Sequence, residues 1–368
     1  MSDDLEMGEE FYGDKALRWY QVAATNLTIS HLENGIKRVL IVQPTGSGKT
    51  LTIVSSLSHP KLRRALDVHT SRPLRVLFCA HKRRLLSQAE STFVDGCNVE
   101  LITQSIFSDI PKEVLETGWD VTVLDESHHE ACVSFQYQLE QIGERPVIGL
   151  TATPDRADGC IIKFEEIVEP ISRVQAVTEG WLADSELRTF IDTPERDKTQ
   201  IIKDIIDEFG KDFGQTMVFV RTKKEVSELT SYMKSKKLKV ASITSESDKQ
   251  LDVILGQFEK KEIQFIINCN KISEGVDVKG CTDVILGRQF GSYPQINQVI
   301  GRTSRPDSES RVWELINPLS GTNLDTTVVI GTPKKHTLHY RINTTWTERT
   351  FDYTTVGSSI ESAIRIGE

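Results

Sequence analysis

The sequence predicts an α/β protein of two tandem domains, each a parallel β-sheet with helices on both faces. Two observations indicate this fold class. Short apolar runs recur at regular intervals with helix-like segments between them, which is the pattern of parallel sheets built from alternating strands and helices. One early run leads into a turn, Q-P-T-G-S-G-K-T, which is typical of a phosphate-binding loop between a strand and a helix.

The expected strands form two series, one in each half of the chain. They are residues 39–42, 74–80, 99–103, 121–125 and 147–153, and then 216–220, 240–244, 263–268, 283–287 and 312–316. Between two strands of the second series, residues 223–237 carry Val226, Leu229 and Met233 at helical spacing, which predicts a helix with one apolar face. A first helix is expected over about residues 11–30.

Shifts in composition divide the chain into four segments. They are an acidic tail (residues 1–14), a first domain (15–183), a second domain (184–319) and a small β-rich C-terminal appendage (320–368). The appendage is expected to be β-rich because residues 336–353 alternate like strands. Its aromatic and basic residues fit either the core and edge of a small sheet or a platform for stacking single nucleic-acid strands: Tyr340, Arg341, Trp346 and Phe351.

The composition indicates an ordinary soluble protein, with 26% charged and 38% hydrophobic residues. No apolar run approaches the ~20 residues that a membrane-spanning helix needs, so no membrane partner is expected. The N-terminus is acidic and lacks the basic start and apolar core of a secretory signal. The six cysteines form no C-x-x-C pair, which suits free thiols in a reducing compartment. The expected location is the cytoplasm, or the host cytoplasm if a phage encodes the chain.

The net charge of −9 argues at first against a nucleic-acid partner. The tail, residues 1–14, has six acidic residues and no Lys or Arg, and without it the net charge is −3. Local basic clusters decide contact with phosphates, and a nearly neutral body can hold such clusters. Charge alone therefore leaves nucleic acid open as a partner.

The Gly-rich turn has the residue types that a polyphosphate needs. Gly46 and Gly48 let backbone N–H groups point at the phosphates, and the following helix adds partial positive charge. Lys49 would reach the β- and γ-phosphates, and the Thr50 hydroxyl would bind Mg²⁺. The usual pattern has Gly where Gln43 stands, so a Gly-rich turn that happens to contain Lys-Thr is the alternative interpretation.

Two adjacent acids follow the apolar run 121–124, at the edge of a parallel sheet where ligands bind. Asp125 would hold the Mg²⁺ that Thr50 also contacts, while Glu126 would orient and deprotonate the attacking water. A solvated acidic pair at a strand end is the alternative. The phosphate-binding loop about 75 residues upstream favours the catalytic interpretation.

In order and spacing, these motifs resemble those of superfamily 2 helicases and translocases of the DExH type, which have two RecA-like P-loop NTPase domains. The resemblance covers most of residues 15–306 and rests on L-R-W-Y-Q (17–21), Q-P-T-G-S-G-K-T (43–50), A-H-K-R-R-L-L-S-Q (80–88), I-T-Q-S-I (102–106), D-E-S-H-H (125–129), L-T-A-T-P-D-R-A-D-G (150–159), M-V-F-V-R-T (217–222), N-C-N-K-I-S-E-G-V-D (268–277) and Q-V-I-G-R-T-S-R (298–305). With V-T-E-G-W-L-A (177–183), the chain looks most like the XPB-like and phage-type DNA repair and recombination helicases and the motor subunits of restriction enzymes.

The resemblance implies ATP and Mg²⁺ as cofactors. The implied ATP-binding residues are Arg18, Gln21, Pro44, Thr45, Gly46, Ser47, Gly48, Lys49, Thr50, Gly275, Asp277 and Gln298. Gln21 would face the adenine edge and Asp277 the ribose. Arg302 and Arg305 would join Lys49 and the two acids in catalysis, as arginine fingers that are worth about 10³–10⁵ in rate in other phosphoryl-transfer enzymes.

The resemblance also implies nucleic-acid contacts, mainly to the backbone, which carry no sequence information. The implied residues are His81, Arg83, Arg84, Thr103, Gln104, Arg221 and Thr222. The basic run at residues 82–84 also fits a solvated helix start.

The implied function is an ATP-dependent DNA helicase or translocase that moves along or remodels single-stranded or branched DNA in replication, recombination or repair. Two alternatives stay open. One is an RNA-directed DExH ATPase, and the other is a nucleic-acid-binding ATP switch without strand separation. The sequence does not indicate protein partners.

Overall fold

The computed structural model describes residues 11–80, 86, 90–92, 97–106, 108–127, 133–153, 164–191, 196–244, 250–269, 278–306, 309–316, 326–331, 333, 335–342 and 345–352. No helix in this part of the chain is long and apolar enough to cross a membrane.

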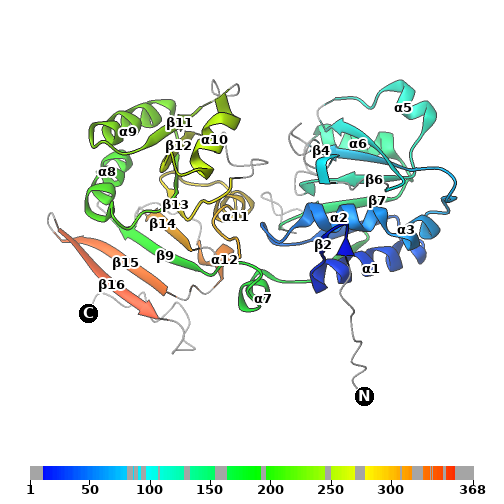
Figure 1. Cartoon of the computed structure of the whole chain (residues 1–368), viewed down its shortest axis with the longest axis horizontal. Helices are drawn as coiled ribbons and strands as arrows, with labels where there is room; N and C mark the ends of the chain where they lie inside the picture. The colour runs from blue at the N-terminus through cyan, green and yellow to red at the C-terminus, as the bar shows by residue number, and fades with distance from the viewer. Residues whose placement is uncertain are drawn as a thin grey trace, which may run out of the picture. The chain divides into compact units, whose positions relative to one another are not determined.

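The chain divides into two compact units, Met1–Ser172 and Arg173–Glu368 (Figure 1). The sequence places the domain boundary after residue 183, but the structure assigns the preceding helix to the second unit. This helix is α7 (Arg173–Thr178). The backbone N–H of Ala183, which follows α7, donates to the carbonyl of Ser304 at 3.3 Å. The connection between the predicted domains is therefore bonded to the second one.

The first unit contains a six-stranded parallel sheet in the order β5-β4-β6-β7-β3-β8. Its strands are β3 (Arg38–Val42), β4 (Leu74–Ala80), β5 (Val99–Ser105), β6 (Val121–Leu124), β7 (Val147–Thr151) and β8 (Glu166–Val168). All five strands predicted in this half are confirmed. The edge strand β8 is an addition, because three residues are too few to show a period in the sequence.

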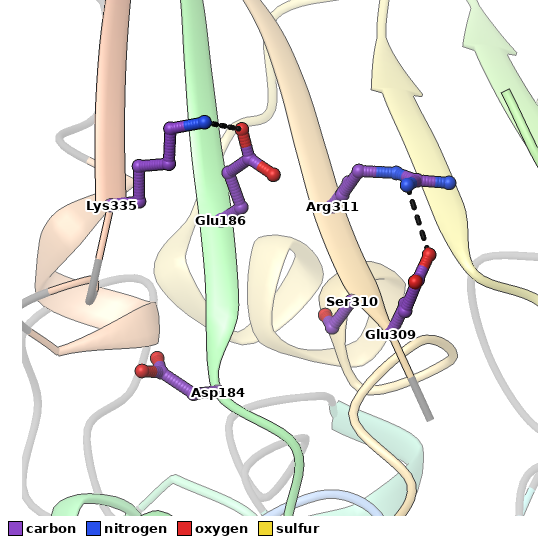
Figure 2. A pocket seen from close by; sticks show the side chains of 6 residues that line it. All are labelled: Asp184, Glu186, Glu309, Ser310, Arg311 and Lys335. Carbon is purple, nitrogen blue, oxygen red and sulfur yellow. Dashed lines mark hydrogen bonds and ion pairs between the residues drawn. The ribbon is translucent and has the colours of Figure 1, made fainter. Parts of the chain in front are cut away.

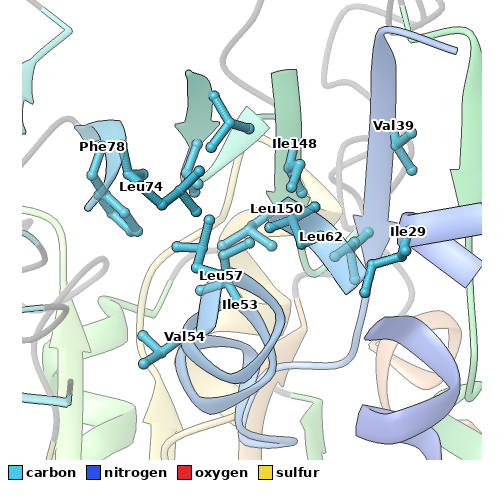
Figure 3. Packing of buried hydrophobic residues seen from close by; sticks show 14 of the residues in the cluster. Ile29, Val39, Ile53, Val54, Leu57, Leu62, Leu74, Phe78, Ile148 and Leu150 are labelled. Atoms are coloured by element: carbon cyan, nitrogen blue, oxygen red, sulfur yellow. The ribbon is translucent and has the colours of Figure 1, made fainter. Parts of the chain in front are cut away.

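Helices cover both faces of this sheet. They are α1 (Trp19–Glu33), α2 (Lys49–Ser58), α3 (Pro60–Ala65), α5 (Lys112–Thr117) and α6 (Val133–Ile142). Side chains on a strand alternate between faces, so Val76 and Phe78 of β4 pack with α1, α2 and α3, while Leu77 and Cys79 pack with α5 and α6. Figure 3 shows the first of these layers, where α1, α2 and α3 meet β3, β4 and β7.

The second unit contains an eight-stranded sheet in the order β11-β12-β10-β13-β14-β9-β15-β16. Its strands are β9 (Ser185–Ile191), β10 (Thr216–Val220), β11 (Val240–Ile243), β12 (Phe265–Cys269), β13 (Asp283–Leu286), β14 (Ser310–Ile316), β15 (Lys335–Ile342) and β16 (Thr345–Asp352). All neighbours are parallel except β15 and β16. The five strands predicted in this half are confirmed.

This sheet is also covered on both faces. In addition to α7, the described helices of the unit are α8 (Lys198–Phe209), α9 (Lys223–Ser235), α10 (Leu251–Glu259), α11 (Tyr293–Ile300) and α12 (Thr327–Ile330). On β10, Met217 packs with α10 and α11, and Val218 packs with α8 and α9. The predicted apolar face of α9 is confirmed, because Val226, Leu229 and Met233 are all buried. The α/β fold class with parallel sheets in two tandem parts is therefore confirmed.

The β-rich C-terminal segment extends the second sheet, because β15 pairs with β9 in parallel and β16 pairs with β15. Its side chains belong to the core and edge of that sheet. Trp346 contacts Phe190 edge to face, with 5.2 Å between ring centroids. Arg341 lies over Trp346 and pairs with Asp204 of α8 at 2.9 Å. These contacts favour the packing interpretation of the segment over a stacking platform.

The predicted first helix is wrong at its start. A two-stranded hairpin, β1 (Phe11–Tyr12) and β2 (Lys15–Ala16), precedes α1. Gly13 has a φ of +62° and makes the turn of this hairpin. The helix begins only at Trp19, where Gln21 Oε1 accepts from the backbone N–H of Arg18 at 2.9 Å.

A buried carboxylate joins the N-terminal ends of β13 and β14. Asp283 is fully buried and accepts hydrogen bonds from Arg311 Nε at 2.7 Å and Nη2 at 2.9 Å. It also accepts from the Trp313 indole at 2.9 Å and from the Gly214 backbone N–H at 3.0 Å. The hydrogen bonds to Asp283 raise the pKa of Arg311. Replacing this carboxylate by an amide would leave the Arg311 charge without its buried partner and turn one of the two acceptor oxygens into a donor.

We expect Asp283→Asn to lower the free energy of unfolding of the second unit by about 3 kcal/mol, the cost of breaking a buried ion pair. Hydrogen exchange of the β13 and β14 amides in the full chain measures this loss. Glu309→Gln is the matched control, because Glu309 pairs with the same arginine at 2.9 Å but its side chain is 74% exposed. Equal loss of protection in the two variants would contradict the role of Asp283.

Candidate active site

The predicted phosphate-binding loop connects β3 to the N-terminus of α2. Gly46 and Gly48 have φ angles of +89° and +91°, a left-handed conformation that residues with a Cβ atom rarely adopt. Gly48 directly precedes α2, and a Cβ atom there would lie 2.8 Å from Nε2 of Gln21. The loop therefore favours glycine at both positions for its backbone, and at Gly48 a side chain would also displace the Gln21 amide.

Hydrogen bonds behind the loop hold its conformation. Ser47 Oγ donates to the carbonyl of Pro44 at 2.7 Å, and Lys49 Nζ donates to the carbonyl of Gln43 at 3.3 Å. The Gln43 side chain is fully buried, and its Oε1 accepts from Thr52 Oγ1 at 3.0 Å. Gln43 thus ties the end of β3 to the first turn of α2. This packing role explains a residue that departs from the usual Gly.

The start of α1 contacts the back of the same loop. Arg18 Nη1 donates to the Tyr20 hydroxyl at 2.7 Å, and that hydroxyl donates to the carbonyl of Ser47 at 2.8 Å. Gln21 Nε2 lies 3.4 Å from the carbonyl oxygens of both Ser47 and Gly48. The assignment of Gln21 to the adenine edge stays a prediction. Tyr20 belongs to no predicted site, and its only signal in the sequence is its place before Gln21.

The two predicted acids follow β6 on the same edge of the sheet. The backbone N–H of Asp125 donates to the carbonyl of Cys79 at 3.0 Å. Burial and the charge of Glu126 raise the pKa of Asp125, whereas the charge of Lys49 and the backbone N–H of Glu126 oppose that rise. Because the charge of Lys49 acts on the pKa of Asp125, the loop and the acid pair belong to one electrostatic site.

The residues of this edge fit a magnesium–nucleotide complex. A buried carboxylate with a raised pKa gains from a nearby cation. Thr45 Oγ1 is buried and has no hydrogen-bond partner among the residues that the structure describes. The same residues include no cluster of three or more His, Cys, Asp or Glu that could hold a metal ion. Nucleotide-bound Mg²⁺ commonly takes only one or two protein ligands, and Asp125 and Thr50 fit that number.

The predicted catalytic arginines lie in the turn after α11. Arg302 and Arg305 are half-buried, and Thr303 and Ser304 between them are fully buried. Arg173 Nη2 donates to Ser304 Oγ at 2.8 Å, and burial lowers the pKa of Arg173 to about 10. Arg173 thus anchors the turn that carries the two predicted arginines. It lies outside every motif, so the sequence alone did not indicate this contact.

Three further predicted nucleotide residues belong to the second unit. Gln298 is buried in α11, and its Oε1 has no partner within the described part of the chain. Gly275 and Asp277 lie outside the described residues. The structure thus brings together the predicted nucleotide residues of the first unit. In the second unit it places Gln298 near the turn that carries Arg302 and Arg305, called the arginine turn below.

Two of the predicted nucleic-acid residues of the first unit lie on β5. Thr103 is half-buried, and Gln104 is buried. The Gln104 amide donates to the carbonyl of Ser108 at 2.8 Å and to that of Asp109 at 3.1 Å, so it holds the turn after β5. His81, Arg83 and Arg84 lie outside the described residues.

Arg221 and Thr222, the predicted nucleic-acid residues of the second unit, follow β10 and are both exposed. Thr222 is the N-cap of α9, where its Oγ1 accepts from the backbone N–H of Glu225 at 3.2 Å. The Glu225 carboxylate accepts in return from the N–H groups of both residues at 2.8 Å. This capping box fixes the backbone and leaves the Arg221 side chain on the surface.

A separate pocket of ≈ 300 Å³ lies at the N-terminal ends of β9, β14 and β15 (Figure 2). It is lined by Asp184, Glu186, Glu309, Ser310, Arg311 and Lys335. In Figure 2, Lys335 pairs with Glu186 and Arg311 pairs with Glu309. Three acidic side chains line the pocket, and its two basic side chains are already paired with acidic ones, so the lining does not suit phosphates.

The chain matches two known protein families, and both matches agree with the resemblance predicted from the sequence. Residues 197–307 match the helicase conserved C-terminal domain, and residues 14–100 match the type III restriction enzyme res subunit. These matches and the relatives below confirm the predicted resemblance to superfamily 2 helicases and translocases. The two units have the fold of its RecA-like domains. This likeness supports a nucleic-acid-dependent ATPase.

The individual relatives of this chain are distant. The type I restriction enzyme EcoAI endonuclease subunit of Escherichia coli is 26% identical, over 83% of this chain and 46% of its own length. The DNA 3'-5' translocase XPB2 of Sulfurisphaera tokodaii is 23% identical, over 82% of this chain and 81% of its own length. A fragment of an HsdR subunit of a type I restriction enzyme from Vibrio vulnificus YJ016 has the same fold, with a TM-score of 0.68 at 23% identity over 88% of this chain and 68% of that chain. The chain spans about half the length of the first curated relatives that it matches.

We expect Gly48→Ala to abolish measurable nucleotide binding, because the added Cβ would strain the left-handed backbone and push Gln21 away from the loop. Titration with a fluorescent ATP analogue measures the loss. Gly35→Ala is the matched control, since Gly35 has a φ of +85° and open space around its Cβ position. Nucleotide binding by Gly48→Ala at the level of Gly35→Ala would contradict the assignment of the loop.

Proposed function

We propose that this chain is an ATP-dependent DNA translocase or helicase, in which ATP hydrolysis drives movement along single-stranded or branched DNA in replication, recombination or repair. One observation carries the proposal. The order β6-β7-β3 puts the phosphate-binding loop and the acid pair on the same sheet edge, where the charge of Lys49 acts on Asp125. A P-loop beside a strand-end acid pair is the arrangement with which P-loop NTPases bind Mg²⁺ and ATP.

The residues of the first unit divide the chemistry between them. Bound Mg²⁺ and ATP supply neutralising charge and the phosphoryl group that water attacks. The N–H groups around Gly46 and Gly48 and the ammonium of Lys49 bind phosphate oxygens, and Asp125 holds the metal. Glu126 accepts a proton from the attacking water. Glu126 has a φ of +55°, a strained backbone that residues at functional sites often adopt.

The second unit is proposed to contribute Arg302 and Arg305 to the nucleotide and Arg221 to nucleic-acid phosphate. The arginine turn is fixed from behind by Arg173. Arg221 stands on an exposed surface at the end of β10, where a phosphate can reach it. Backbone contacts of this kind position a strand without reading its sequence.

DNA is the proposed substrate because the relative that aligns over 81% of its own length is a DNA 3'-5' translocase. RNA is the alternative polymer. We expect single-stranded or forked DNA to raise the steady-state ATPase rate of the full chain more than RNA of the same length does. Stronger stimulation by RNA would show that RNA, and not DNA, is the substrate. No stimulation by either polymer would refute the proposed function.

We expect Lys49→Ala to lose ATP binding and Glu126→Gln to retain it while the rate of hydrolysis falls by about 10²–10⁴, the usual contribution of a general base. Phosphate release and nucleotide titration, measured in parallel, separate the two effects. Glu144→Gln is the control, since Glu144 is a carboxylate of the same unit with a 90% exposed side chain. Normal turnover in Glu126→Gln would remove its assigned role.

A further inference from the structure

Two side chains at the start of α1 contact two consecutive carbonyls of the phosphate-binding loop. The strongest of these contacts comes from Tyr20, whose hydroxyl lies 2.8 Å from the carbonyl oxygen of Ser47. Gln21 Nε2 adds longer contacts of 3.4 Å to the carbonyls of Ser47 and Gly48. These contacts reach the loop on the side that faces α1.

The direction of the Tyr20 hydrogen bond is determined by its other partner. A phenol has one proton to donate, and the Arg18 guanidinium can only donate. Since Arg18 Nη1 lies 2.7 Å from the hydroxyl, the hydroxyl accepts from Arg18 and gives its own proton to Ser47. The Tyr20 ring is fully buried and packs edge to face on Trp19, so the hydroxyl has one orientation.

The geometry of the peptide group gives this contact a consequence for phosphate binding. In a planar trans peptide, the carbonyl of one residue and the N–H of the next point in opposite directions. Holding the Ser47 carbonyl against Tyr20 therefore directs the N–H of Gly48 away from α1. Gly46 and Gly48 are free to adopt many conformations, so the loop needs such a restraint from outside to keep its donors aligned.

We propose that Tyr20 is a positioning residue that aligns the Gly48 N–H for phosphate binding, with Arg18 orienting its hydroxyl. The proposal rests on the proposed function, because it concerns the ATP site. It assigns to Tyr20 an effect on the phosphate end of the nucleotide and none on the base.

The test is Tyr20→Phe in the full chain, which removes the hydroxyl and keeps the buried ring. Isothermal titration with ATP and with inorganic tripolyphosphate separates the two ends of the ligand. We expect both affinities to fall by the same factor of about 3 to 10, as for loss of one buried hydrogen bond. The KM for ATP should rise by that factor while kcat stays within about twofold, because the N–H binds phosphate before and during the reaction.

Tyr12→Phe is the matched control. Tyr12 lies in the same unit, belongs to its apolar core, is 7% exposed, and has a hydroxyl 3.4 Å from Ser58 Oγ. The Tyr12→Phe variant should leave the affinities for ATP and for tripolyphosphate unchanged. A second variant, Arg18→Met, should weaken tripolyphosphate binding in the natural chain and add little in the Tyr20→Phe background, since both act through one hydroxyl. If Tyr20→Phe does not fold, the effect of Arg18→Met on tripolyphosphate decides the question.

The outcomes separate this proposal from the proposed function. A natural chain that binds and hydrolyses ATP, beside a Tyr20→Phe variant with unchanged affinities, overturns the role of Tyr20 alone. Loss of ATP affinity with normal tripolyphosphate affinity places the effect at the base and also overturns it. An equal loss in Tyr12→Phe shows a general effect of the core, with the same result. A natural chain that does not bind ATP refutes the proposed function itself.

Discussion

The candidate active site depends on the parallel register of β6, β7 and β3. Leu124 is level with Gly149, and Val42 is level with Thr151, so the three strands end at one edge. The loop, the acid pair and the turn after β7 all leave the sheet there, although they are far apart in the sequence. A Cβ atom at Gly149 would meet the Phe164 ring and would lie 2.8 Å from Ser127 Oγ. The absence of a side chain at this point of β7 therefore leaves room for Ser127, the residue that follows the acid pair.

The second sheet presents its predicted functional residues at two opposite edges. Arg302 and Arg305 precede β14, whereas Arg221 follows β10, which runs parallel to it within the same sheet. The first of these edges is held by the buried charge of Asp283 and by the contact of Arg173 with the arginine turn. If these arginines have their predicted roles, one unit offers phosphate-binding groups to two different ligands, as linking a nucleotide to a nucleic acid requires.

Regular periodicity made most of the fold predictable. All ten strands in the two predicted series are confirmed, and the apolar face of α9 followed from Val226, Leu229 and Met233. The failures have local causes. A Gly13 turn interrupts the predicted first helix, and β8 is too short to show a period. The capping role of Thr222 and the buried amide of Gln104 were missed because a motif does not show which way a side chain points.

The loop also shows what a motif leaves out. Its pattern names residues that face the nucleotide, but its conformation depends on residues that contact it from behind. Gln43 occupies the position where the usual pattern has Gly, and its buried amide accepts a hydrogen bond from Thr52. Tyr20 restrains the other end of the loop through Ser47. The same loop conformation is thus maintained from β3 and from α1, so the first Gly of the pattern can be replaced where the replacement is buried and bonded to α2.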